Sequence, residues 1–274
     1  MPRTARRTRR STRAAALGAT ALLALSACSS SDDSTTATSD SSSASSSDEV
    51  RGTVTVFAAA SLKESFTTLG KRFEEEHPGT KVTFSFGGSD SLAASITGGA
   101  PADVFASASP KTMEIVTDAG DASGTPTTFV RNQLEIATTP GNPDGIDSLG
   151  DLTGSGLKVV LCDRAVPCGA AAQKALDAAG LKLTPVSYEQ DVKAALTKVE
   201  LKEADAAVVY KTDVRAADGK VEGVEFPESA DAVNDYPIVR LKDAPNAEAA
   251  EAFIALVRSA EGRRVLTGAG FLKP

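Results

Sequence analysis

The sequence predicts an α/β fold in which parallel sheets are covered by helices. Short apolar runs rich in Val and Phe, typical of buried strands, alternate with longer segments whose apolar residues have helical spacing. Several of the strands run directly into small residues that are followed at once by a helix. Ligands of open α/β sheets bind beyond the carboxyl ends of the strands. These strand-to-helix turns are therefore the predicted location of a ligand site.

This alternation covers residues 53–274. Strands are predicted at 53–58, 81–86, 103–107, 128–138, 157–161, 185–188, 205–210, 222–226 and 236–241. Helices are predicted at 62–77, 91–98, 110–119, 169–180, 191–199 and 246–260, with a short one near 261–267.

The first strand-to-helix turn is the most informative. The strand beginning at Val54 ends in three alanines and Ser61. Ser61 occupies the position of a helix N-cap, and Glu64 three residues later completes a predicted capping box. Free N–H groups and a hydroxyl at such a turn favour binding of an oxyanion.

Similar turns follow along the chain. Ser89 comes after a strand and Gly-Gly, the N–H of Cys168 opens the helix 169–180, and Asp191 caps a helix while leaving the Val192 N–H free. Tyr210 ends a buried strand, and its phenol can donate a hydrogen bond. A serine before a helix is usually only a cap, so each turn alone is a weak signal. Two further tyrosines are predicted to pack in the core or at a hinge: Tyr188 and Tyr236.

The N-terminal segment has the pattern of a secretory signal peptide. Residues 1–27 combine an Arg-rich start with an apolar run over 14–25, and Leu25 to Cys28 resembles a lipobox. This resemblance implies cleavage before Cys28 and lipid on that cysteine. A short transmembrane anchor is the alternative, but the run is shorter than the ~20 residues of a span. Residues 28–49 are almost entirely small and polar, which predicts a disordered tether.

The remaining charge is acidic. Removing six arginines with residues 1–27 leaves 23 basic against 36 acidic residues, a net charge of −13. This balance argues against nucleic acid and anionic membranes as partners, and against anion binding by a basic patch. Cys162 and Cys168 favour a disulfide in an exported protein, with two free thiols as the alternative. The sequence has a single histidine, His77, at a predicted helix end. This argues against a structural zinc site, which needs four ligands, and against a histidine base beside Ser61.

Four motifs together resemble the molybdate-binding proteins of bacterial ABC importers. They are Val56-Phe-Ala-Ala-Ala-Ser-Leu62, Gly99-Ala-Pro-Ala-Asp-Val-Phe-Ala-Ser-Ala108, Val166-Pro-Cys-Gly169 and Val208-Val-Tyr210. The resemblance covers roughly residues 53–274 and implies a two-lobed type II periplasmic binding protein fold, with the ligand in the cleft between lobes joined by two hinge crossings. The implied lobes are residues 50–128 with 236–274, and residues 129–235.

By this resemblance the oxyanion is bound by neutral donors. These are the hydroxyls and N–H groups of Ser61 and Ser89, the N–H groups of Cys168 and Val192, and the Tyr210 hydroxyl. The implied ligand is molybdate or tungstate, with sulfate or phosphate as the alternative. The implied protein is a monomeric, lipid-anchored, extracytoplasmic binding module without cofactor or catalytic residues, whose partner is a membrane permease. A hydrolase with Ser61 or Cys168 as nucleophile, and an adhesion or sensor lipoprotein, are the competing classes.

Two positions depart from the expected pattern. Cys168 stands where the family commonly has a small residue such as Ala, and our hypothesis is that a disulfide to Cys162 pre-organises the N–H. Asp90 lies beside Ser89, where we expect it to face solvent and favour the helix dipole. If Asp90 faced the ligand, it would repel a dianion but could accept the proton of hydrogen phosphate.

Overall fold

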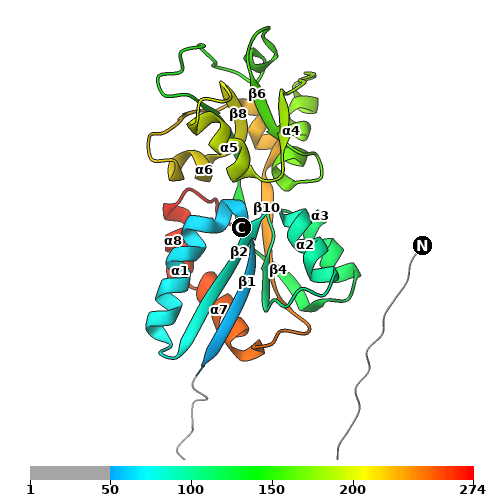
Figure 1. Ribbon diagram of the computed structural model, residues 1–274, viewed down its shortest axis with the longest axis vertical. Coiled ribbons are helices and arrows are strands. Elements are labelled where there is room, and N and C mark those ends of the chain that lie inside the picture. The colour runs from blue at the N-terminus through cyan, green and yellow to red at the C-terminus, as the bar shows by residue number, and fades with distance from the viewer. Residues whose placement is uncertain (1–49) are drawn as a thin grey trace, which may run out of the picture. The chain divides into compact units, whose positions relative to one another are not determined.

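The computed structural model describes residues 50–274 (Figure 1). The predicted signal peptide, the lipidation site Cys28 and the tether lie outside the described residues. Between residues 50 and 274 no helix is long and apolar enough to cross a membrane.

The first sheet contains five strands in the order β2-β1-β3-β10-β4. Strands β1, β2 and β3 run parallel, and β10 pairs antiparallel with both β3 and β4. The strands are β1 (Gly52–Ala59), β2 (Thr80–Gly87), β3 (Val104–Ala106), β4 (Ala122–Asn132) and β10 (Asn234–Leu241). Its helices are η1 (Ala60–Leu62), α1 (Lys63–Glu76), α2 (Ser89–Thr97), α3 (Pro110–Asp118), α7 (Ala247–Arg258) and α8 (Ala260–Gly268). We call this sheet and its helices the first lobe.

The second sheet also has five strands, in the order β7-β6-β8-β5-β9. They are β5 (Leu134–Thr138), β6 (Val159–Cys162), β7 (Ser187–Glu189), β8 (Ala206–Tyr210) and β9 (Glu222–Val224). Its helices are η2 (Asp151–Thr153), α4 (Pro167–Ala178), α5 (Val192–Glu200), α6 (Lys211–Ala216) and η3 (Pro227–Ala232). We call this sheet and its helices the second lobe. Figure 1 shows α4 on one side of this sheet and α5 with α6 on the other.

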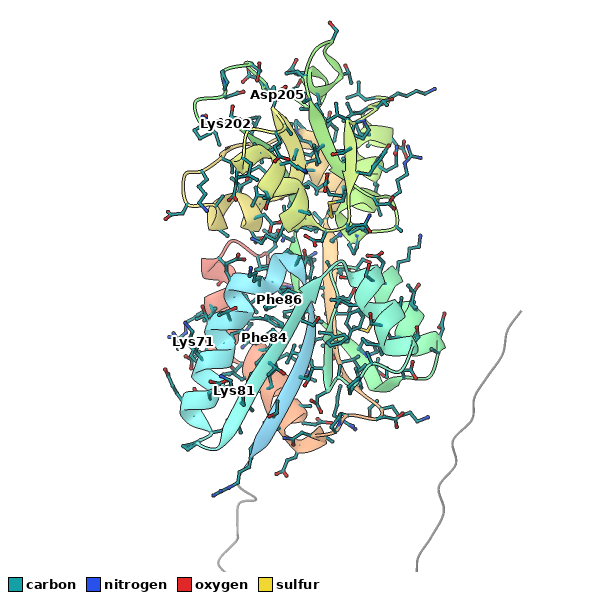
Figure 2. The ribbon with its side chains drawn as sticks, in the orientation of Figure 1. Lys71, Lys81, Phe84, Phe86, Lys202 and Asp205 are labelled. Carbon is teal, nitrogen blue, oxygen red and sulfur yellow. A yellow bond between two sulfur atoms is a disulfide. The ribbon has the colours of Figure 1, made fainter. Side chains whose placement is uncertain are left out.

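The two lobes have hydrophobic cores of different composition. In the first lobe, α1 buries Phe66 and Phe73 completely, and both rings meet Phe253 of α7 edge-on at 5.9 and 5.6 Å. Figure 2 shows Phe84 and Phe86 on β2, and their rings stack at 5.1 Å beside this cluster. The second core consists mainly of Ala, Val and Leu from β5, β6, β8, α4 and α5. Large apolar residues at helical spacing therefore fix α1 on the core of the first lobe, and with it the strand-to-helix turn that carries Ser61.

The chain passes between the sheets at two places. Strand β4 ends at Asn132 in the first sheet and β5 begins at Leu134 in the second, while β10 brings the chain back at Asn234. The single strand predicted at 128–138 is wrong, because it is two strands in different sheets. The polar run Arg131-Asn-Gln133 interrupts the apolar pattern at this crossing, so the sequence carries a signal for the change of sheet that the prediction of one strand overlooked. Residues 129–132 and 234–235, expected in the second lobe, belong to strands of the first sheet.

The predicted helices agree with the structure except at short elements. The six-residue helix α6 follows β8 directly and was not predicted, because its polar sequence carries no apolar stripe. The break between α7 and α8 is set by Ser259, whose Oγ accepts hydrogen bonds from the N–H groups of Glu261 and Gly262.

Candidate functional site

A small cavity lies where the carboxyl ends of strands from both lobes meet. Its volume is about 10 Å³, close to the space of one water-sized sphere. The structure brings all five predicted site residues to its wall: Ser61, Ser89, Cys168, Val192 and Tyr210. The rest of the wall is Ala59, Ala60, Gly87, Gly88, Ala108, Val166, Pro167 and Asp191. This space is far smaller than the several hundred Å³ of pockets for drug-sized ligands.

Ser61 is placed differently from the prediction. It lies inside η1, and the N-cap of α1 is Leu62, which makes no side-chain cap hydrogen bond. The predicted capping box of Ser61 and Glu64 is therefore wrong, because the extra turn of η1 moves Ser61 away from the start of α1. Its Oγ is instead 2.8 Å from the hydroxyl of Tyr236 on β10.

Ser89 is the first residue of α2, and Gly88 is the N-cap. The predicted cap hydrogen bond is absent from this helix start. The Ser89 Oγ accepts a hydrogen bond from the Ala108 N–H at 3.0 Å, and the side chain is buried. A Cβ added to Gly88 would come within 2.5 Å of the Gln190 carbonyl oxygen. The glycine before Ser89 therefore permits the close approach of the second lobe.

Cys168 is the second residue of α4, which begins two residues before the predicted start at Gly169. Pro167 occupies the first position, as is common in helices. An N–H in the first turn has no acceptor inside the helix, so the Cys168 N–H is available to a ligand. A disulfide joins Cys168 to Cys162 at the end of β6, with a Cα–Cα distance of 5.9 Å. It ties the start of α4 to the sheet.

Val192 is the first residue of α5, and Asp191 is its N-cap. The predicted cap is confirmed, since Asp191 Oδ1 accepts a hydrogen bond from the Ala194 N–H at 2.9 Å. The Val192 N–H has no acceptor inside the helix. The start of α5 therefore adds a second backbone donor from the second lobe.

Tyr210 ends β8, and its side chain is almost completely buried. Its hydroxyl oxygen accepts a hydrogen bond from Asn234 Nδ2 at 2.7 Å. Burial raises the pKa of Tyr210 well above its ordinary value, so the phenol stays protonated and can donate.

The other two tyrosines differ from each other. Tyr236 is fully buried at the start of β10, where its ring meets Tyr210 and Phe271 edge-on, which confirms the predicted packing. Tyr188 is 43 % exposed, so the same prediction is wrong for it. Tyr188 lies in β7, an edge strand of only three residues, and an edge strand leaves one side uncovered.

The cavity wall is nearly free of charge. Among residues 50–274, no lysine or arginine side chain belongs to the wall. Figure 2 places Lys71 and Lys81 on the first lobe and Lys202 on the second, away from the region between the sheets. The single carboxylate of the wall is Asp191, which is engaged as a helix cap. Partial positive charge at helix starts is therefore the main electrostatic attraction for an anion here.

Asp90 does not line the cavity. Its Oδ2 accepts a weak hydrogen bond from Ser91 Oγ, but its Oδ1 is buried and without a hydrogen-bond partner among the described residues. The prediction that Asp90 faces solvent is thus wrong for one of its oxygens. The reason is that Oδ1 lies beside Gly88, where the two lobes approach each other.

An ion-pair network lies next to the part of the cavity wall that belongs to the second lobe. The Lys193 Nζ is 3.0 Å from Glu64 Oε2 of the first lobe and 3.1 Å from Asp213 Oδ1 of the second. Burial raises the pKa of Asp213 to about 6, although Lys193 opposes this shift. Burial alone would lower the pKa of Lys193, but Asp213 and Glu64 together raise it. Lys193 therefore stays charged and links α5 to α1.

Sequence reasoning missed Asn132 and Asn234 at the two crossings. Asn132 Nδ2 lies 3.3 Å from the Tyr236 oxygen, and Asn234 Nδ2 lies 3.0 Å from the Ala108 carbonyl oxygen in addition to its bond to Tyr210. An Asn two residues before the predicted strand 236–241 is the only signal that the sequence offers for Asn234. No group of three or more metal-ligating side chains occurs in the part of the chain that the structure describes.

Comparisons with known proteins agree with this geometry. Residues 54–272 match the family model described as bacterial extracellular solute-binding protein. The molybdate-binding protein ModA of Mycobacterium tuberculosis H37Rv is 46 % identical over 222 residues, which cover 81 % of this chain and 85 % of that protein. The ModA protein of Haemophilus influenzae is 32 % identical, with 80 % and 89 % covered.

A solved structure shows the same fold. The periplasmic molybdate-binding protein of Azotobacter vinelandii superposes with a TM-score of 0.71 at 23 % identity, covering 81 % of this chain and 99 % of that chain. Fold, site position and sequence similarity converge: the chain belongs to the bacterial extracellular solute-binding protein family, together with the molybdate-binding proteins of ABC importers.

Proposed function

We propose that this protein is an extracytoplasmic binding module that captures molybdate, and also tungstate, for import. The single observation that carries the proposal is that five residues with neutral donors, from distant parts of the chain, line one small cavity. The proposed donors are the hydroxyls and N–H groups of Ser61 and Ser89, the backbone N–H groups of Cys168 and Val192, and the Tyr210 hydroxyl. The similarity to ModA proteins supports molybdate as the ligand.

The donor set fits a fully ionised tetrahedral dianion. Such an ion needs hydrogen-bond donors and no acceptor. Helix starts each supply on the order of half a positive charge, so α2, α4 and α5 can offset the dianion without a lysine or arginine. Each hydrogen bond to a charged group contributes roughly 1.5–3 kcal/mol, and several together can exceed the desolvation cost. Sulfate offers the same acceptors in a smaller ion, so cavity size would decide between them.

The delivery route is part of the same proposal. Lipid on Cys28 would hold the protein at the outer face of the cell membrane, with residues 28–49 as the tether. Closure of the lobes around the ion would create the surface that a membrane permease recognises. On this proposal the protein binds and releases its ligand unchanged and is not an enzyme.

Calorimetric titration of residues 50–274 near neutral pH tests the proposal, with molybdate, tungstate, sulfate and phosphate as ligands. We expect tight one-to-one binding of molybdate and tungstate and no heat from the other two. Binding of phosphate would contradict the donor-only site and would indicate that Asp90 accepts the phosphate proton. Silence with all four ions would contradict the proposed ligand class.

A further inference from the structure

The three hydroxyls of the cavity share one arrangement. Each hydroxyl oxygen is next to a protein group that can donate a hydrogen bond to it. Ser89 Oγ accepts from the Ala108 N–H at 3.0 Å, and the Tyr210 oxygen accepts from Asn234 Nδ2 at 2.7 Å. In both cases the donor has no lone pair to offer, so the hydroxyl hydrogen must point elsewhere. For Tyr210 the acceptor is either a bound ligand or the Tyr236 oxygen, with which its hydroxyl also interacts.

The neighbouring amide favours one direction for the third contact, in which either hydroxyl can be the donor. Asn132 Oδ1 accepts from the Gln133 N–H at 3.0 Å, which fixes its Nδ2 toward Thr212 Oγ1 at 2.8 Å and the Tyr236 oxygen at 3.3 Å. Because an amide nitrogen only donates, the Tyr236 oxygen is the acceptor there. Its single hydrogen is then free for Ser61 Oγ at 2.8 Å.

The groups that orient these hydroxyls belong to the crossings between the lobes. Asn234 and Tyr236 begin β10, and Asn132 ends β4. Asn234 Nδ2 also lies 3.0 Å from the Ala108 carbonyl oxygen and 3.4 Å from that of Pro167, and both residues line the cavity. Tyr236 is fully buried, and burial raises its pKa above the ordinary value, so its hydrogen is retained.

We propose that Tyr236 and Asn234 are positioning residues that turn the hydroxyl hydrogens of Ser61 and Tyr210 toward the bound oxyanion. The proposal rests on the proposed function and extends it to specificity. With the hydroxyls oriented as donors, a ligand that carries its own proton finds no acceptor there. The hinge strand thus favours fully ionised oxyanions over hydrogen phosphate.

A double-mutant cycle on the full-length protein, purified in detergent, tests the role of Tyr236. Tyr236→Phe keeps the ring that contacts Tyr210 and Phe271 and removes only the hydroxyl. We expect Tyr236→Phe and Ser61→Ala each to weaken molybdate binding about tenfold. In the Ser61→Ala background, Tyr236→Phe should then change affinity less than about twofold, because its effect acts through Ser61. Tyr188→Phe, which removes an exposed phenol hydroxyl, is the matched control and should leave affinity unchanged.

The outcomes separate the two levels of the proposal. If the affinity losses of Tyr236→Phe and Ser61→Ala multiply in the double variant, the positioning role of Tyr236 is overturned. Molybdate binding by the unmodified protein would still support the proposed function in that case. Absence of molybdate binding by the unmodified protein would contradict the proposed function instead.

Selectivity provides a second readout. Tyr236→Phe should narrow the affinity ratio of molybdate to phosphate, because Ser61 becomes free to accept a proton. An unchanged ratio would overturn the specificity role. If Tyr236→Phe lowers the thermal unfolding temperature so far that it cannot be titrated, the cycle of Asn234→Ala with Tyr210→Phe asks the same question, and multiplying losses there would overturn the proposal.

Discussion

In the proposed donor set, the first lobe offers the hydroxyls and N–H groups of Ser61 and Ser89, whereas the second offers the backbone N–H groups of Cys168 and Val192 and one phenol; all five residues line the cavity. The serine hydroxyls can rotate and depend on neighbours such as Ala108 and Tyr236 for their orientation. Backbone N–H groups at helix starts are fixed by the helix itself. The two lobes therefore differ in their hydroxyl donors: those of the first lobe depend on neighbouring groups for orientation, whereas most donors of the second lobe are fixed backbone N–H groups.

Removing one backbone donor should have the largest effect. Val192→Pro deletes the N–H at the first position of α5, where proline is tolerated, and Asp191 before it already has extended dihedral angles of −159° and 171°. We expect molybdate affinity to fall about 100-fold, because a hydrogen bond to a charged ligand is lost from a fixed position. Isothermal titration measures the loss. Val192→Ala keeps the N–H and should change affinity only about threefold; equal losses in both variants would contradict the assignment.

The second lobe also carries a titrating carboxylate behind Tyr210, whereas every first-lobe residue of the cavity wall is uncharged. The pKa of Asp213 is about 6 in the folded protein, against an ordinary value of 3.8. Between these values the folded state retains a proton that the unfolded state has released. Stability should therefore fall as pH rises from about 4 to about 6, by about 3 kcal/mol, and then level off.

Chemical denaturation at several pH values measures this slope. Asp213→Asn removes the titrating group, so the difference in unfolding free energy between this variant and the unmodified protein should change across the same pH range. Parallel pH profiles would show that Asp213 does not titrate there.

Removing the disulfide tests whether a rigid second lobe is needed for stability and for ligand affinity. Replacing Cys162 and Cys168 by alanine opens a loop of sequence separation 6. We expect the free energy of unfolding to fall by about 2 kcal/mol, and molybdate affinity to fall because the Cys168 N–H is held less firmly. Sub-micromolar affinity that is unchanged by the substitution, or by reduction of the native protein, would show that the disulfide serves folding alone.

The smallest effect is expected from a hydroxyl of the first lobe. Ser89→Ala removes one ligand-facing hydroxyl and leaves the Ala108 N–H without its acceptor. We expect affinity to fall about tenfold, less than for Val192→Pro, because a rotatable donor contributes less than a fixed one. Ser91→Ala in the same helix turn changes an exposed hydroxyl and is the control. A larger loss for Ser89→Ala than for Val192→Pro would reverse the comparison between the lobes.

Much of this architecture could be predicted from local pattern. The alternation of strands and helices predicted the α/β class. The Asp191 cap was predicted because the cap residue and the N–H group that it binds are only three residues apart. The Ser61 capping box failed because η1 inserts a turn that the sequence spacing does not reveal. The strand 128–138 was not divided because only three polar residues, 131–133, separate its apolar parts, which belong to different sheets.

The sequence by itself pointed to the five candidate residues, since strand ends and helix starts are local features within a few residues and the resemblance to molybdate-binding proteins singled these positions out. Only the tertiary structure decided what orients them. Ser61 and Tyr236 are 175 positions apart, and Asn132 and Tyr236 are 104 apart. Such contacts depend on where the chain crosses between sheets, and the three polar residues at 131–133 mark a break in the hydrophobic pattern without revealing which sheet each strand joins.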